Sequence, residues 1–276
     1  MNGAATAYRR LFGAAVAAAA RLPPALAEAW GAPGAAGVPV RLLTAASGGG
    51  LIRLVHSAGT SAQPFRCTGW AASEWAVADV DVMTRRASQV GFTVLVEPGP
   101  VGAGGHLRAL QASGAGGEGI YLTEITSVPP GFRLPSGRGS HGVLYGAVLG
   151  AADLPAARGF FEDGFEVTRV TDHPLPVRAI NLVHSLPAGT RHRVSTLQLG
   201  GRAILEIDQY PVSATPRPRN PGEVPPGIVA MTFLAGCLPA AAGHLLPARP
   251  EPPYLGRPAW SRELPDGGVL EVVAAR

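Results

Sequence analysis

The sequence contains no lysine, and all 23 of its basic residues are arginines. Charged residues make up 15% of the 276 positions, and the formal net charge is only +4. The arginines are scattered, with pairs at 9–10 and 85–86 but no longer basic run. Nucleic-acid-binding proteins carry clustered positive charge on one face or along one helix. We therefore expect no nucleic-acid partner.

Cysteine is nearly absent too. Cys67 and Cys237 lie far apart in the chain and form neither the short spacing of a metal site nor a disulfide framework. We expect two free thiols in a reducing compartment.

Long apolar runs are also missing, since no stretch reaches the roughly 20 residues that span a membrane. We therefore predict no membrane association. The segment that follows Arg9-Arg10 imitates a secretory signal, but Arg21 interrupts it. The prediction is a cytoplasmic protein, with a signal peptide over 1–27 as the alternative.

A repeated pattern occupies the middle of the chain. A short apolar segment leads to an aspartate, a helix-length stretch follows, and Gly-Phe-x-Val opens the next extended segment. The two aspartates are Asp79 and Asp153, and the Gly-Phe-x-Val steps lie at 91–94 and 164–167. Each copy ends in two extended segments around a glycine turn. This pattern predicts a repeated β-α-β-β-β unit.

Weaker copies flank the two clear ones and give four predicted units. They lie at about 1–62, 66–128, 139–212 and 224–276, and the first unit lacks its first strand. Helices are predicted from about residue 7 and at 79–90, 153–163 and 237–246. Because the proline- and glycine-rich stretch 127–139 cannot form a central strand, we predict two domains. These are 1–130 and 139–276, each holding two units.

This arrangement resembles the vicinal oxygen chelate superfamily, which includes glyoxalases, bleomycin-resistance proteins and extradiol dioxygenases. The resemblance is carried by the aspartate steps at 77–80 and 151–154, the two Gly-Phe-x-Val steps, and the ending Asp-Gly-Gly-Val-Leu-Glu at 266–271. It implies an α+β fold in which four tandem βαβββ units form two cup-shaped mixed or antiparallel sheets with helices outside. It also implies a small-molecule ligand. The units that share a cup could be neighbours in the chain or nested.

The resemblance also bears on metal binding. Metal-dependent members place His, Gln or Glu seven residues before the aspartate, where this chain has Ala72 and Gly146. Only Glu206 and Glu271 match the glutamate position in the last strand of a unit. Because two carboxylates make a poor site for a chelated metal, we predict no cofactor, with a divalent metal as the disfavoured alternative.

Strand alternation predicts which side chains face the cups. The set predicted to pack outward, against helices, comprises Trp75, Val77, Tyr145, Ala147, Leu149, Met231 and Phe233. The set predicted to face inward comprises Ala72, Glu74, Ala76, Leu144, Gly146, Val148, Gly150, Ala230, Thr232 and Leu234.

Acid–base chemistry is the function that these residues favour. Two carboxyls in a dry cleft repel each other, so that one keeps its proton near neutral pH and the pair supplies a base and an acid. The candidate catalytic residues are Glu206, Glu271, Glu74 and Tyr121. The candidate ligand-binding residues are Arg53, Gly146, Val148, His141, Thr232 and Trp260.

The predicted function is therefore a glyoxalase-like lyase or isomerase that acts without metal on a small hydrophobic or aromatic oxygenated molecule. One alternative is a binding protein of the bleomycin-resistance type, which sequesters its ligand intact. A second is a metal-dependent extradiol-type dioxygenase. A homodimer is compatible with each of these functions.

Overall fold

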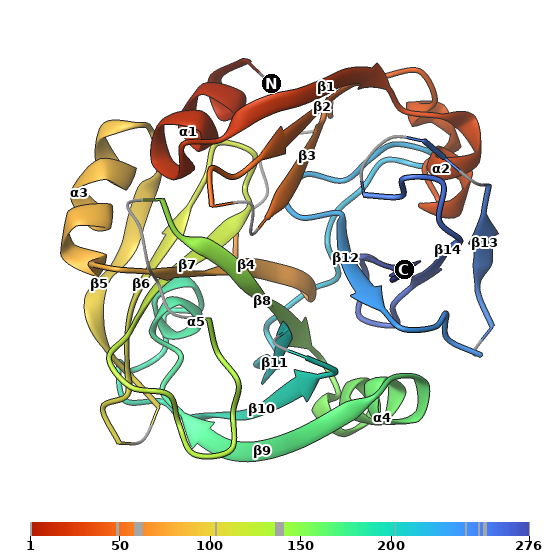
Figure 1. The fold of residues 1–276 in the computed structure, drawn as a ribbon. Helices are drawn as coiled ribbons and strands as arrows, with labels where there is room; N and C mark the ends of the chain where they lie inside the picture. Colours follow the sequence, from red (N-terminus) through yellow and green to blue (C-terminus); the bar gives the residue numbers. More distant parts are fainter. Residues whose placement is uncertain are drawn as a thin grey trace.

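The computed structural model describes residues 2–47, 50–57, 63–102, 104–135, 141–201, 203–240, 242–247, 249–250 and 253–275. Within these residues the strands form sheets of three, eight and four strands. Figure 1 shows the eight-stranded sheet curling around a short helix, with the two smaller sheets beside it. The α+β fold of four tandem units, predicted from the sequence, is confirmed.

The eight-stranded sheet has the strand order β5-β6-β7-β4-β8-β11-β10-β9. The second unit supplies β4 (Gly69–Val77), β5 (Thr93–Val101), β6 (Leu107–Ser113) and β7 (Gly119–Ile125). The third unit supplies β8 (Val143–Ala151), β9 (Val167–Leu175), β10 (His192–Leu199) and β11 (Ala203–Gln209). In each unit the first strand runs parallel to the last, and β4 meets β8 in antiparallel pairing at the centre.

The strand pairing in this sheet shows which units share a cup. The second and third units share one cup, because β4 and β8 are hydrogen-bonded along their length. The pairing is therefore nested, and the sheet crosses the predicted division between 1–130 and 139–276.

The first and fourth units form the two smaller sheets. The first unit supplies β1 (Ala15–Arg21), β2 (Pro39–Thr44) and β3 (Leu51–Val55), in that order. The fourth unit supplies β12 (Ala230–Ala235), β13 (His244–Leu246), β14 (Ala259–Glu263) and β15 (Val269–Ala274), in the order β12-β15-β14-β13. The first element of the first unit in the described residues is the helix α1 (Asn2–Phe12).

The repeated aspartates explain where the two central helices begin. Helix α3 (Val80–Gln89) follows Asp79, whose Oδ1 accepts a hydrogen bond from the Val82 amide at 2.8 Å. Helix α4 (Leu154–Gly164) follows Asp153, which accepts one from the Ala156 amide at 3.1 Å. Each aspartate is thus an N-cap that satisfies an otherwise unpaired amide in the first helical turn.

The remaining helices are short. They are α2 (Pro24–Ala29), the 3-10 helix η1 (Pro33–Ala35) and α5 (Arg178–Val183). No helix in the described ranges is long and apolar enough to cross a membrane.

The helix predicted at 237–246 is wrong. The described residues of this segment hold bends and then β13. The physical reason is that α4 already covers the outer face of the fourth unit's sheet: Phe161 of α4 packs in one apolar cluster with Trp260, Leu270 and Val272. Figure 1 shows α4 between the eight-stranded sheet and β12. One helix therefore serves two sheets.

The C-terminal turn fastens the fourth unit to the central sheet. Asp266 accepts a hydrogen bond from the Ala152 amide at 2.7 Å, and Trp70 of β4 donates one from its indole to the Val269 carbonyl at 2.8 Å. A Cβ at Gly268 would lie 2.6 Å from the Trp70 ring, so only glycine fits there.

The predicted alternation holds for most of the central strands. Trp75 and Val77 pack with α3, and Ala147 and Leu149 pack with α4. Met231 and Phe233 likewise pack outward, against the cluster that contains α4.

The alternation fails at the start of β8, where Tyr145 was predicted outside and Leu144 inside. Glu74 pairs with Gly146 and Trp75 with Leu144, so Tyr145 is the extra residue of a β-bulge. The bulge turns Leu144 outward, against the Trp75 cluster, and brings Tyr145 to the inner side with Ile204.

Replacing Phe161 with Ala tests the shared role of α4. Phe161 is 1% exposed, so the substitution should lower the free energy of unfolding by about 3–5 kcal/mol through lost burial and a cavity. Urea unfolding measures the change. The neighbouring Phe160→Ala is the control, because Phe160 is only partly buried. Equal losses in both variants would contradict this packing.

Candidate functional site

Three carboxyl groups lie on the concave face of the eight-stranded sheet. Glu74 comes from β4, and Glu206 and Asp208 come from β11; both strands flank β8. Glu74 is opposite Gly146 of β8, where a Cβ would lie 2.4 Å from the Glu74 Oε2 atom. Gly146, predicted to line the cup, therefore makes the room that the Glu74 side chain occupies.

Tyrosines surround these carboxyls. Tyr145 donates a hydrogen bond to Glu74 and accepts one from Thr123. Tyr121 stacks on Phe65 with ring centroids 5.8 Å apart. Tyr210, just after β11, lies over Gly150, where a Cβ would come within 2.4 Å of its ring.

Several buried polar atoms in this cup have no hydrogen-bond partner among the described residues. They are the hydroxyls of Tyr121 and Tyr210, and the carboxyl oxygens of Asp208 have no partner there apart from the neighbouring Glu206 carboxyl. Buried polar groups in proteins are nearly always paired with protein, water or ligand. The cup thus presents both donors and acceptors to a polar occupant.

Burial and mutual repulsion keep protons on the carboxyls. Burial raises the pKa of Glu206 to about 7. Burial also raises the pKa of Glu74 and of Asp208 well above the usual range, and the charge of Glu206 adds to both rises. Glu206 is only half-buried, whereas Glu74 is 6% exposed and Asp208 fully buried. Glu206 is therefore the accessible carboxyl that changes charge near neutral pH.

Apolar side chains cover the cup. Phe65 packs with Ala179 and Ile180 of α5 over the inner face. Phe132 and Leu134 pack near Tyr145. These groups exclude water from the carboxyls, which is the physical cause of the raised pKa values.

The other candidate glutamate, Glu271, has a different environment. Its carboxylate accepts hydrogen bonds from the Trp30 indole at 2.8 Å, from Thr232 at 2.7 Å and from the Tyr254 hydroxyl at 3.2 Å. Arg53 pairs with it at 3.4 Å.

Arg53 is itself held firmly. Its guanidinium lies over the rings of Trp30 and Tyr254, at 5.3 and 5.4 Å from their centroids, and donates to the Tyr254 hydroxyl at 2.9 Å. Because donors and a cation already satisfy Glu271, this cluster joins β3 to β15 rather than supplying a base. Arg53, Glu271 and Thr232 were all predicted as site residues from the sequence, and the structure brings these three together.

The structure separates the other predicted pairs. Glu206 and Glu271 lie in different sheets, so they form no acid–base pair across one cup. Glu74, Glu206, Tyr121 and Val148 do line one cup, since Tyr121 is affected by the charges of both glutamates and packs with Val148.

Two predicted ligand-binding residues lie elsewhere. Trp260 is 2% exposed in the outer core with Phe161 and faces neither cup. The His141 ring lies against Gly13, at the end of α1. The spacing of Trp260 in the fourth unit could not show that α4 of the third unit covers it.

Sequence reasoning missed Asp208 and Tyr210, and it predicted Tyr145 on the outer face of the sheet. Asp208 lies two residues after Glu206 and so shares its face of β11, which the alternation rule could have found. Tyr145 faces inward because of the bulge in β8, which the alternation rule does not predict.

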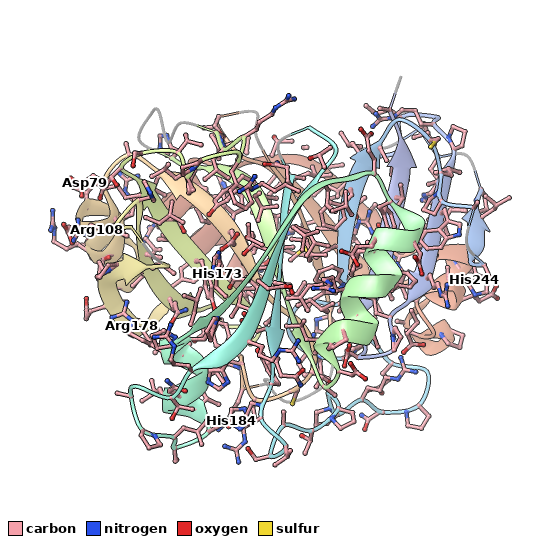
Figure 2. The ribbon with its side chains drawn as sticks, turned by 90° about the horizontal axis from the view of Figure 1, so that it is seen from below. Asp79, Arg108, His173, Arg178, His184 and His244 are labelled. Atoms are coloured by element: carbon pink, nitrogen blue, oxygen red, sulfur yellow. The ribbon has the colours of Figure 1, made fainter. Side chains whose placement is uncertain are left out.

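The residues do not fit a divalent metal. Within the described ranges, no group of three or more His, Cys, Asp or Glu is arranged to hold an ion. His173, His184 and His244 lie far apart in Figure 2. Glu271 is surrounded by donors and a cation, which repel another cation. We therefore assign no step of the chemistry to a metal.

Comparisons with known proteins address the fold. No protein-family profile matches the chain, and no curated protein sequence matches it. Among solved structures, glyoxalase I from Zea mays is similar with a TM-score of 0.59 at 17% identity, over 99% of this chain and 88% of that one. A candidate dioxygenase from Bacillus subtilis is similar with a TM-score of 0.57 at 10% identity, over 97% and 79%.

The chain therefore has the fold of the vicinal oxygen chelate superfamily. Its similarity to glyoxalase I extends over nearly its whole length, as the resemblance of its repeats implied. At these identities the likeness establishes the fold, while the activity has to be argued from the site.

Replacing Arg53 with Met should destabilise the protein by about 3–5 kcal/mol, because it leaves the fully buried Glu271 carboxylate without its counter-charge. Urea unfolding measures the loss. The double variant R53M/E271Q should recover part of it. Arg219→Met removes a surface pair with Glu263 and should change little. If R53M is as mild as R219M, Arg53 does not join the sheets.

The raised pKa of Glu206 predicts a pH-dependent stability. The unfolded chain loses this proton near pH 4.5, whereas the folded protein holds it until about pH 7. The proton on Glu206 therefore adds to the free energy of unfolding in full below pH 4.5. This stabilisation, about 3 kcal/mol at most, is lost as the pH rises through 7. Urea unfolding at pH 5 and pH 8 should show this loss in the wild type and in the exposed-site control Glu97→Gln. Glu206→Gln should remove the share of this loss that comes from Glu206, while Glu74 and Asp208, whose pKa values burial also raises, keep a remaining pH dependence. An unchanged pH dependence in that variant would refute the assignment.

Proposed function

We propose that this protein is a metal-independent acid–base enzyme of the lyase or isomerase class, acting on a small oxygenated molecule in the eight-stranded cup. One observation carries the proposal: three carboxyls, Glu74, Glu206 and Asp208, share one shielded cup, where burial raises the pKa of each and brings that of Glu206 to about 7. General acid–base catalysis needs one ionised group as the base and one protonated group as the acid near the working pH.

Glu206 serves as the base in this mechanism. Its carboxylate takes a proton from a carbon next to a carbonyl group of the substrate. A neighbouring protonated carboxyl, Glu74 or Asp208, gives a proton to the carbonyl oxygen, so that a neutral enol forms. When the substrate has a double bond between its β and γ carbons, return of the proton from Glu206 to the γ carbon, with return of the enol proton to its donor, gives the conjugated isomer. In a lyase, the enol electrons instead expel a leaving group from the β carbon, the leaving group takes the proton from Glu206, and the enol proton returns to its donor carboxylate.

The tyrosines position the substrate. Tyr121 and Tyr210 have hydroxyls without partners among the described residues, and these can donate to substrate oxygens. Tyr145 bonds Glu74 and fixes its orientation. The aromatic rings of Phe65 and Tyr121 favour an apolar or aromatic substrate body. The free thiols of Cys67 and Cys237 suit a reducing compartment, which supports the proposed cytoplasmic location.

Hydrogen–deuterium exchange tests the proposal without knowledge of the natural substrate. In D₂O, the wild type should incorporate deuterium at the carbon next to the carbonyl of compounds such as propiophenone or 2-oxobutyrate, measured by ¹H NMR. Glu206→Gln should lower the exchange rate about 100-fold or more, because a general base contributes roughly that factor. The rate should rise with pH around 7 as Glu206 ionises.

Glu97→Gln is the matched control, since it makes the same chemical change at an exposed site. Exchange by E206Q at the wild-type rate would refute the base assignment. Tight binding of an intact compound without exchange would support the sequestration alternative. Near-stoichiometric iron, manganese or zinc in the purified protein would support the dioxygenase alternative.

A further inference from the structure

Arg217 is a cation without a carboxylate partner at the edge of the eight-stranded cup. It lies in the segment after β11, and its side chain is partly buried. Its guanidinium donates hydrogen bonds to backbone carbonyls: Trp70 at 2.5 Å, Pro226 at 3.4 Å, and Ile228. No acidic side chain pairs with it among the described residues. A guanidinium taken partly out of water is normally matched by an anion.

A small cavity adjoins this guanidinium. Its volume is about 10 Å³, enough for one water-sized group, and its lining includes Arg217, Cys67, Phe65 and Ala71. Phe65 and Ala71 also belong to the apolar cluster on the inner face of the cup. The cavity therefore borders the apolar cluster of the cup, which also contains Tyr210.

Tyr210 connects the cavity to the carboxyls. The charge of Arg217 acts on the Tyr210 hydroxyl, and so do the charges of Asp208 and Glu206. That hydroxyl is buried and has no hydrogen-bond partner among the described residues. Tyr210 is thus within electrostatic reach of both Arg217 and the carboxyls of the cup.

We propose that Arg217 and Tyr210 bind an oxyanion of the substrate, so that the substrate is a small organic anion such as a carboxylate. The inference rests on the proposed function, because it assigns a substrate class to the same cup. Because no carboxylate pairs with Arg217 among the described residues, an anionic ligand would supply the missing partner. A guanidinium and a hydroxyl donor together form charge-assisted hydrogen bonds to a carboxylate.

A purely structural role for Arg217 is the competing explanation, since its carbonyl contacts hold Trp70 of β4 near residues 226–228. Ligand binding separates the two roles. A structural tie would change stability but would not distinguish an anion from its neutral analogue. The charge of the probe is therefore the deciding variable.

The experiment is isothermal titration calorimetry with benzoate, benzamide and inorganic phosphate. The wild type should bind benzoate at least about tenfold more tightly than the neutral benzamide, as expected for a charge-assisted contact. Arg217→Gln should weaken benzoate binding about tenfold or more. Tyr210→Phe, which removes only a hydroxyl, should weaken it roughly threefold to tenfold.

Arg219→Gln is the matched control: it removes the same charge two residues away, from a surface pair with Glu263, and should leave benzoate affinity unchanged. If R217Q does not fold, Y210F decides. Absence of benzoate binding, equal affinity for benzamide, equal effects of R217Q and R219Q, or wild-type affinity in Y210F would overturn the proposal. Arg217-dependent binding of phosphate in preference to benzoate would overturn the organic-anion class.

Failure of this inference is distinguishable from failure of the proposed function. Charge-selective benzoate binding that depends on Arg217, together with full deuterium exchange in E206Q, would retain the anion site and reject the base. Exchange that depends on Glu206, together with benzoate affinity unaffected by R217Q and Y210F, would retain the base and reject the anion site.

Discussion

The carboxyl groups of Glu74, Glu206 and Asp208 would repel one another as anions, yet the eight-stranded sheet holds all three on its concave face. Apolar side chains from α5 and from residues 129–135 shield this face from water, which makes the repulsion costly. The raised pKa values of Glu74 and Asp208 reduce this repulsion, because they favour the protonated form of these two buried carboxyls. Glu206, the most accessible of the three, is left to change charge near neutral pH.

The same position in the repeat has opposite electrostatics in the two halves of the fold. Glu206 and Glu271 each lie in the last strand of a unit, next to the first. Two other carboxyls lie beside Glu206, whereas Arg53 and three neutral donors satisfy Glu271. One cup therefore retains groups suited to proton transfer, and the other uses its carboxylate to join two incomplete sheets. The same position in the repeat therefore has different neighbouring side chains in the two cups, and the two glutamates have different roles.

Local patterns predicted the units well, because caps and alternation act over a few residues. Asp79 and Asp153 marked the helix starts, and the inner position of Glu206 followed from alternation. Longer-range features could not be predicted. A bulge at Tyr145 reversed the alternation because it depends on register with β4, and α4 replaced the expected helix at 237–246 by packing on two sheets at once. The nested pairing of units depends on contacts between segments that the sequence does not connect.

The central claim is that Glu206 titrates near pH 7 because its carboxyl is buried in a cup that is shielded from water. The most direct measurement is a ¹³C NMR titration of the glutamate and aspartate side-chain carboxyls, with Glu206→Gln used to assign the signal. The account predicts that the signal lost in this variant titrates near pH 7 in the wild type. A Glu206 midpoint close to 4.5, the usual glutamate value, would contradict it.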